Sequence, residues 1–139
     1  CRLVDFQGAV ESHAANTMSI TVCGTLPTIS PEVALGGPYS LRFVDGWSAG
    51  VVFIEMAGGL DSMQNCIGYD PQQFLESAMA IQDFFRSDDC HSRILRHRNA
   101  DEQDPNTLQI VQMLVQTNPE ERAEIQRVEE LEFLQNAWG

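Results

Sequence analysis

The side chains best suited to covalent or metal chemistry are four cysteines and three histidines: Cys1, Cys23, Cys66, Cys90, His13, His91 and His97. The cysteines lie far apart and form no C-x-x-C pair, so the usual signatures of a zinc ribbon or a thioredoxin-like site are missing. A metal site would have to combine Cys66 and Cys90 with His91 and His97, and this spacing matches no standard ligand set. The pattern therefore predicts neither a metal site nor a cofactor.

An N-terminal cysteine such as Cys1 could act as a nucleophile with its own α-amine as the general base, because that amine titrates near neutral pH. The histidines lie in no recognisable nucleophile motif, and neither G-x-S-x-G nor a glycine-rich phosphate loop occurs. A small hydrolase built on Cys1 is therefore an alternative, and the main expectation is a protein without catalytic residues.

The charge of the chain narrows the class of partner. Formal net charge is −12 over 139 residues, and the eight basic residues are all arginines. Such a surface repels a phosphate backbone, so nucleic acid is not expected as a partner. An acidic decoy of a basic protein remains a further alternative, although no carboxylate spacing mimics phosphates.

Length and hydropathy predict one acidic domain over residues 1–139, since no repeat or linker divides the chain. No apolar run is long enough to span a membrane. Widely spaced cysteines in a chain that needs no disulfide favour the reducing cytoplasm.

The first third should contain a helix, a strand and a loop. Apolar residues recur at helical spacing over residues 3–15, although Gly8 weakens a helix there. Residues 17–22 alternate between polar and apolar side chains in the pattern of a half-buried strand. The interval 24–38 holds too many prolines and glycines for a long element, so we expect a loop.

The middle of the chain has the pattern of a β-hairpin. Residues 39–43 alternate, Asp45-Gly46 supplies turn chemistry, and residues 51–56 return as an apolar run rich in β-branched side chains. After Gly58-Gly59, a third strand could run over residues 61–69.

Helix signals follow at Asp70, a candidate N-cap, with Pro71 at the first helical position and Gln73 completing a capping box. We expect a helix over residues 70–86 with a wide apolar stripe. Asn118, Pro119 and Glu121 repeat the same start signals before an amphipathic helix over residues 119–138.

The segment 90–117 fits two structures. The glutamines within residues 108–116 fall at helical spacing, whereas the Ile-Val and Leu-Val pairs suit a buried strand. We expect a hairpin of residues 92–98 and 107–116. The predicted fold class is then α+β, with an antiparallel sheet of about five strands and helices on one side. Its order is helix, three strands, helix, two strands and the C-terminal helix.

This order of elements resembles the class I type III secretion chaperones, small acidic bacterial cytosolic proteins that hold secretion effectors before export. The resemblance covers about residues 37–138 as a pattern, and the loop 24–38 is longer than this family usually has. It implies a homodimer, an extended segment of an effector as partner, and no cofactor.

The resemblance also implies roles for two sets of apolar residues. The 70–86 helix would pair two subunits through Phe74, Ala78, Met79, Ile81 and Phe85. An extended client would add a strand to the sheet edge and press apolar side chains into grooves, with Ile20, Val22, Leu41, Phe43, Val52 and Ile54 as the expected partner-binding residues. Burial in the chain's own core is the competing role for both sets.

Overall fold

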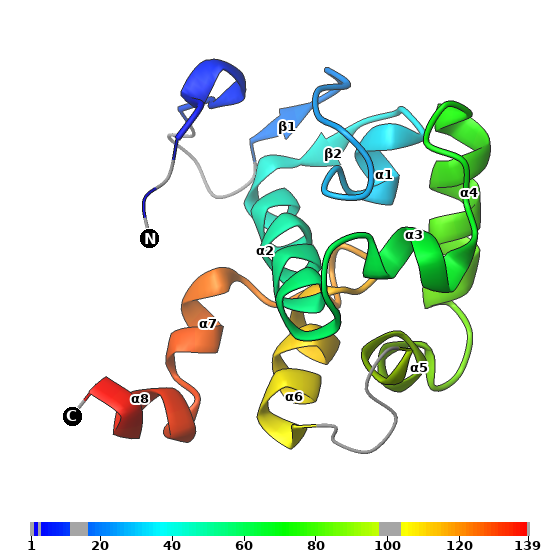
Figure 1. Cartoon of the computed structure of the whole chain (residues 1–139). Coiled ribbons are helices and arrows are strands. Elements are labelled where there is room, and N and C mark those ends of the chain that lie inside the picture. Colours follow the sequence, from blue (N-terminus) through cyan, green and yellow to red (C-terminus); the bar gives the residue numbers. More distant parts are fainter. Residues whose placement is uncertain (1, 3, 12–16, 98–103, 139) are drawn as a thin grey trace.

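The computed structural model of this chain is mostly helical, and it describes residues 2, 4–11, 17–97 and 104–138 (Figure 1). Its short elements are a 3-10 turn, η1 (Phe6–Gly8), and two strands, β1 (Met18–Ser19) and β2 (Tyr39–Ser40). The described helices are α1 (Pro31–Ala34), α2 (Leu41–Gly58), α3 (Ser62–Ile67), α4 (Phe74–Phe85), α5 (Cys90–Arg96), α6 (Pro105–Leu114), α7 (Ile125–Glu129) and α8 (Glu132–Trp138).

Helix α2 is the centre of the fold and contacts α3, α5, α6 and α7. It begins where the Ser40 hydroxyl accepts a hydrogen bond from the Arg42 amide, which is an N-cap. Its buried residues recur at helical spacing, and the main core forms around Trp47, Val51 and Ile54. Side chains from α3, α4, α5 and α6 complete this core.

Two smaller clusters extend the core on either side of α2. Helices α1 and α4 pack together through Val33, Ala34 and Ala78, with Tyr39 of β2 in the same cluster. On the other side, α6, α7 and the residues of α8 meet around Ile110, Leu114 and Val128.

The sheet holds the segment before α1 against the start of α2. β1 and β2 are antiparallel, with Met18 opposite Ser40 and Ser19 opposite Tyr39. The Leu41 amide donates to the Thr17 carbonyl at 3.0 Å and extends the pairing.

The predicted five-stranded α+β fold is therefore wrong. The hairpin was expected over residues 39–56, but only Tyr39–Ser40 is a strand there, and residues 41–56 lie in α2. The predicted strands over 61–69, 92–98 and 107–116 are replaced by α3, α5 and α6. β-branched residues lose some side-chain freedom in a helix, but this cost is small beside the burial of a whole apolar face. In the Val-Val-Phe-Ile run of α2, Val51 and Ile54 are buried and Phe53 is half-buried, while Val52 is exposed.

The Asp45-Gly46 pair is not a turn, because both residues lie in the second turn of α2. Of the predicted strand over 17–22, only Met18–Ser19 is paired. The loop over 24–38 contains the short helix α1. The helix predicted over 3–15 is reduced to η1 in its described part, and residues 3 and 12–15 lie outside the described residues.

The helix over 70–86 is confirmed, with a later start than predicted. Asp70 Oδ1 accepts from the Gln72 amide at 3.0 Å, but this cap closes a turn, and α4 begins at Phe74. The predicted C-terminal helix is divided in two. The Asn118 side chain accepts from the Glu120 amide and donates to Glu121 Oε1, so the expected N-cap closes a turn, and α7 and α8 follow later. In the described segments, no helix has both the length and the apolar character needed to cross a membrane.

Candidate functional site

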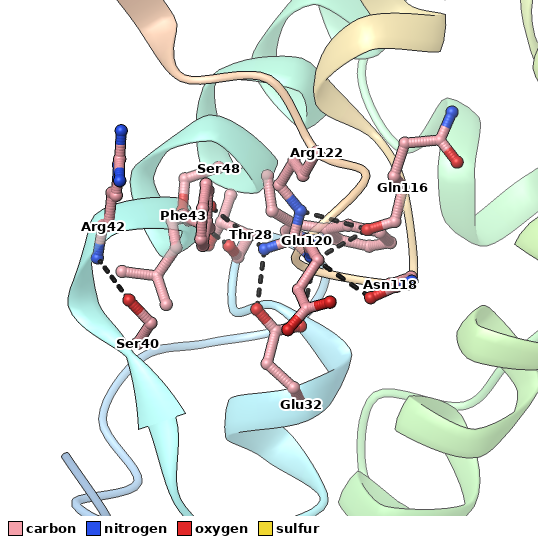
Figure 2. Close-up of polar contacts among 12 residues, drawn as sticks. Thr28, Glu32, Ser40, Arg42, Phe43, Ser48, Gln116, Asn118, Glu120 and Arg122 are labelled. Atoms are coloured by element: carbon pink, nitrogen blue, oxygen red, sulfur yellow. Dashed lines mark hydrogen bonds and ion pairs between the residues drawn. The ribbon is translucent and has the colours of Figure 1, made fainter. Parts of the chain in front are cut away.

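The best-defined polar site is built around the buried side chain of Arg122, between α1, α2 and the turn after α6 (Figure 2). Nη1 and Nη2 donate to the two carboxylate oxygens of Glu32 at 2.6 and 3.0 Å. Nη1 also donates to the Phe43 carbonyl at 3.0 Å, and Nε and Nη2 donate to the Gln116 carbonyl at 3.0 and 2.7 Å. A guanidinium has five N–H donors, and these bonds use all of them. Arg122 is therefore a fully satisfied buried charge in a bidentate pair.

Helix α2 forms the wall on which this guanidinium lies. Arg122 Cζ is 5.3 Å from the centre of the Trp47 ring, a distance at which the cation is attracted to the ring face. A Cβ at Gly46 would lie 2.9 Å from the Ala123 carbonyl oxygen and 3.4 Å from Arg122 Cδ. Glycine is required at position 46 because the 122–123 backbone approaches α2 so closely.

Two hydrogen bonds tie the segment before α1 to α2. Trp47 Nε1 donates to the Pro27 carbonyl at 3.0 Å, and Ser48 Oγ donates to the Thr28 carbonyl at 2.8 Å. Ser30, the N-cap residue of α1, is buried, and its hydroxyl has no hydrogen-bond partner among the described residues. Residues 27–32 are thus held by α2 and by Arg122, with one buried polar group left unsatisfied.

The chain that leads into this segment contains β1 and then runs without helix or strand over residues 20–25. Tyr39 donates its hydroxyl hydrogen to the Thr21 carbonyl at 2.6 Å, which anchors the backbone beyond β1. Met18, Ile20 and Val22 nonetheless remain exposed. The backbone is fixed here while apolar side chains face solvent.

A second polar cluster lies where α5 meets the end of α6. His91 Nε2 is 2.6 Å from the Val115 carbonyl oxygen, and His91 Nδ1 is 3.4 Å from Cys90 Sγ. Burial lowers the pKa of His91, and the contact with the Val115 carbonyl partly opposes this. Burial raises the pKa of the Cys90 thiol, which is the opposite of what a reactive cysteine needs.

An exposed ion pair connects α2 to the segment before α7. Arg42 Nη2 donates to Glu124 Oε1. Their hydrogen bond is the main cause that raises the pKa of Arg42 and lowers that of Glu124. Because both groups are solvated, the pair contributes little to stability.

The predicted partner-binding residues do not share one surface. Ile20, Val22 and Val52 are exposed, Leu41 and Phe43 are half-buried, and Ile54 is fully buried in the main core. No strand edge joins them, because residues 41–58 are helical. Their binding role stays a prediction.

The predicted dimer residues are divided between core and surface. Ala78, Ile81 and Phe85 are buried in this chain's own clusters, and Phe74 is half-buried beside them. Met79 is 55% exposed on α4, next to Leu75, which is equally exposed. Only the Met79 side of the helix is free to meet another molecule, and the dimer stays a prediction.

Other sites considered from the sequence have little support. Cys1 and His13 lie outside the described residues. Within the residues that the structure describes, no group of three His, Cys, Asp or Glu side chains could hold a metal ion. A cavity of about 360 Å³ between α6 and α8 is lined by Asn106, Gln109, Leu131, Glu132, Phe133 and Asn136. These side chains include no nucleophile.

Sequence reasoning missed both partners of the central ion pair. Glu32 lies in a stretch that the breaker residues predict to be a loop, and Arg122 lies in the predicted amphipathic helix. Two signals were available: the Ser30-Pro31-Glu32 start of a short helix, and a single arginine after the acidic run Asn118–Glu121. Neither signal by itself predicts a contact between residues so far apart in sequence.

Comparison with known proteins identifies the family. The protein kinase domain family matches residues 1–134. A putative serine/threonine-protein kinase of Caenorhabditis elegans is 41% identical over 58 residues, which is 42% of this chain and 13% of that protein. The human ribosomal protein S6 kinase-related protein is 40% identical over 58 residues, 42% of this chain and 14% of the relative.

The Aurora kinase of Schizosaccharomyces pombe is 31% identical over 100 residues, 69% of this chain and 27% of the relative. This chain therefore spans only about a quarter or less of the length of these three curated relatives. No solved structure matches it significantly.

These matches overturn the resemblance to type III secretion chaperones. That resemblance rested on an order of strands and helices that the structure does not contain, and a non-catalytic chaperone function falls with it. The family match covers nearly the whole sequence, including the segment 24–38 that fitted a chaperone least well. The chain belongs to the protein kinase domain family.

Proposed function

We propose that this chain is part of a serine/threonine protein kinase, an enzyme that transfers the γ-phosphoryl group of ATP to a hydroxyl group of a protein. The family match and the kinase relatives support this proposal. The activity is proposed for the whole protein, because the chain spans only a small part of those relatives.

Two kinase motifs have counterparts here in the right order. Kinases carry D-F-G, whose aspartate holds Mg²⁺, and further along A-P-E, with the activation loop between them. This sequence has Asp5-Phe6-Gln7-Gly8 and Ser30-Pro31-Glu32 at these places. The departures are Gln7 at the glycine position and Ser30 at the alanine position. Asp5 and Glu32 would be the motif acids.

The observation that carries the proposal is the bidentate contact between Glu32 and the buried Arg122. It ties the end of the segment between the two motifs to the central helix. A kinase needs this segment in a defined place, because the segment lies beside the phosphoryl-transfer site and its order controls activity. The ion pair supplies that anchor.

Magnesium and ATP are implied by the family, and only Asp5 of this chain matches a position that would hold them. Asp5 is exposed, and as the residue before η1 it makes no capping hydrogen bond with its side chain. A carboxylate oxygen is a suitable Mg²⁺ ligand. When bound, the metal would neutralise charge on the transferred phosphoryl group. The 139-residue sequence contains no lysine, no glycine-rich loop and no H-R-D motif.

An apolar stripe at the C-terminal end of α2 and in the turn after it supports the presence of further kinase structure. Val52 and Met56 on α2, and Leu60 in the turn that follows it, are 49, 77 and 79% exposed. Large apolar side chains exposed close together in this way mark an interaction surface. We propose that the remainder of the kinase domain packs on this stripe. A cytoplasmic location, expected from the cysteine pattern, stays part of this proposal.

The proposal is tested with the full-length protein that carries this sequence, incubated with Mg²⁺, radiolabelled ATP and a mixture of serine- and threonine-containing peptides. We expect phosphoryl transfer, and Asp5→Asn should lower it by about 100-fold or more because metal coordination contributes several kcal/mol. The matched control is Asp45→Asn, the same change at an exposed position of α2. Absence of transfer, or equal loss in both variants, would contradict the proposal.

A further inference from the structure

His91 joins the start of α5 to the end of α6 through one directed hydrogen bond. Its Nε2 lies 2.6 Å from the Val115 carbonyl oxygen. A carbonyl oxygen only accepts, so Nε2 carries the hydrogen. Nδ1 of the neutral ring is then an acceptor, 3.4 Å from the Cys90 thiol. The surroundings therefore specify one neutral tautomer of His91.

This hydrogen bond is one peptide away from the Arg122 site. Val115 precedes Gln116, whose carbonyl accepts two of the five hydrogen bonds of Arg122. The peptide units that carry these two carbonyls are adjacent and share the Cα of Gln116, so a hydrogen bond that holds the first unit also restrains the Cα about which the second unit turns. The Val115 amide donates to the Val111 carbonyl at 2.8 Å. The Val115 carbonyl is the backbone group of this residue that His91 binds.

We propose that His91 is a positioning residue for the Glu32–Arg122 pair. In its neutral form it holds the Val115 carbonyl, and with it the Gln116 carbonyl, in the orientation that Arg122 needs to bind Glu32. The activity part of this inference rests on the proposed kinase function. The structural part concerns Arg122 alone and can be judged without any activity.

Protonation would change the surroundings of the ring on the Cys90 side, although a charged ring would still donate to the Val115 carbonyl. It places a charge on a ring that is half-buried against Phe85, with ring centres 5.6 Å apart. It also turns Nδ1 from an acceptor into a donor that faces the Cys90 sulfur, a weak acceptor. Burial lowers the pKa of His91, so the neutral form is favoured in the folded protein. The neutral ring is therefore the form present above pH 6.5, the ordinary pKa, and it is lost only as the pH falls through the lowered pKa of the folded protein.

Few charged groups face the Cys90–His91 pair in the described structure. Arg93 on α5 and Asp88 before α5 act on the Cys90 thiol in opposite directions. Helices α4 and α6 present the neutral residues Phe85 and Val115, and α2 presents Trp47 behind Phe85. On α3, the charge of the same Arg93 lowers the pKa of the Cys66 thiol, against the larger effect of burial, which raises it. His91 is therefore the group in this cluster that gains a charge as the pH falls below 6.5.

The test uses the full-length protein labelled with ¹⁵N, with the Arg122 Nε–H signal assigned by its loss in Arg122→Lys. As the pH is lowered from 7.5 through the titration of His91, we expect this signal to shift together with the signals of the His91 ring. Glutamine can donate from its Nε2 without titrating, so His91→Gln should hold the signal in place. The matched control His97→Gln, an exposed position, should behave as the wild type.

Activity gives the second readout. At pH 7.5, His91→Ala should lower kcat/KM by roughly 2- to 30-fold, the usual range for positioning effects, and His91→Gln should restore it. His91→Gln should also remove the acidic loss of kcat/KM. An Arg122 signal that still shifts in His91→Gln overturns the inference. If no phosphoryl transfer is found at all, the proposed function fails, and the Arg122 signal still decides the role of His91.

Discussion

Glu32 and Arg122 are 90 residues apart in sequence, and their charged groups meet at 2.6 Å. The Arg122 side chain is fully buried, and 16% of the Glu32 side chain is exposed to solvent. A buried ion pair adds little stability compared with well-packed apolar residues of similar volume. Removing one partner is nevertheless costly, because it leaves the other charge buried and unpaired. This asymmetry makes the pair a structural requirement for the segment that ends at Glu32.

Arg122→Lys should destabilise the protein even though it keeps the charge. Lysine cannot make the two parallel bonds to Glu32 and the three bonds to carbonyl groups, so we expect a loss of about 3–5 kcal/mol in the free energy of unfolding. Urea denaturation followed by circular dichroism measures it. The matched control is Arg127→Lys on α7, an exposed position that should change stability by less than about 0.5 kcal/mol. Equal stability of both variants would show that the site is not rigid.

Gly46→Ala should destabilise a helix that alanine would ordinarily stabilise. The added Cβ would lie 2.9 Å from the Ala123 carbonyl oxygen, so the 122–123 turn must move away. Overpacking of this kind costs about 1–3 kcal/mol. Asp45→Ala, one residue earlier and exposed, serves as the control. A rise in melting temperature for Gly46→Ala would contradict the close approach of the 122–123 turn to α2 at this position.

Ser30→Ala should stabilise the fold. The Ser30 hydroxyl is buried without a partner among the described residues, and an unsatisfied polar group of this kind costs about 1–3 kcal/mol. Ser48→Ala is the matched comparison and should lower stability, because that hydroxyl donates to the Thr28 carbonyl. The two variants should therefore differ in sign in the same denaturation experiment, and the same sign would contradict the assignment.

Tyr69 makes stability fall at alkaline pH. Burial, with Glu55 and Asp61 nearby, raises the pKa of its phenol from 10 to about 12. Between these values the unfolded chain releases the proton and the folded chain keeps it, so the free energy of unfolding decreases as pH rises. Tyr69→Phe should remove this part of the decrease between pH 10 and 11, with pH 8 as the reference. An unchanged slope would mean that Tyr69 is solvated.

Met79→Glu tests the predicted homodimer. Met79 is exposed on α4, so the variant should stay folded, and a charge buried at an apolar contact would separate two subunits. Sedimentation or light scattering measures the mass. Glu76→Ala is a control on the same helix. A monomeric wild type would exclude the dimer.

The sequence by itself determined features that depend on local chemistry and on composition. The acidity of the chain, the helix over 74–85 and the capping contacts at Asp70 and Asn118 were readable, because a cap or an amphipathic stripe involves residues close in sequence. The cysteine spacing excluded common metal motifs for the same reason.

Only the tertiary structure decided the conformation of residues 41–58 and 105–114. Their β-branched runs suit a strand or a buried helix equally, and the choice follows from what surrounds them. At Gly50 the backbone of α2 lies so near to α6 that an added Cβ would be 2.9 Å from Leu114 Cβ, a helix crossing that no local pattern encodes. The ion pair of Glu32 and Arg122 was hidden for the same physical reason: its energy arises from burial and geometry that exist only after distant segments have packed.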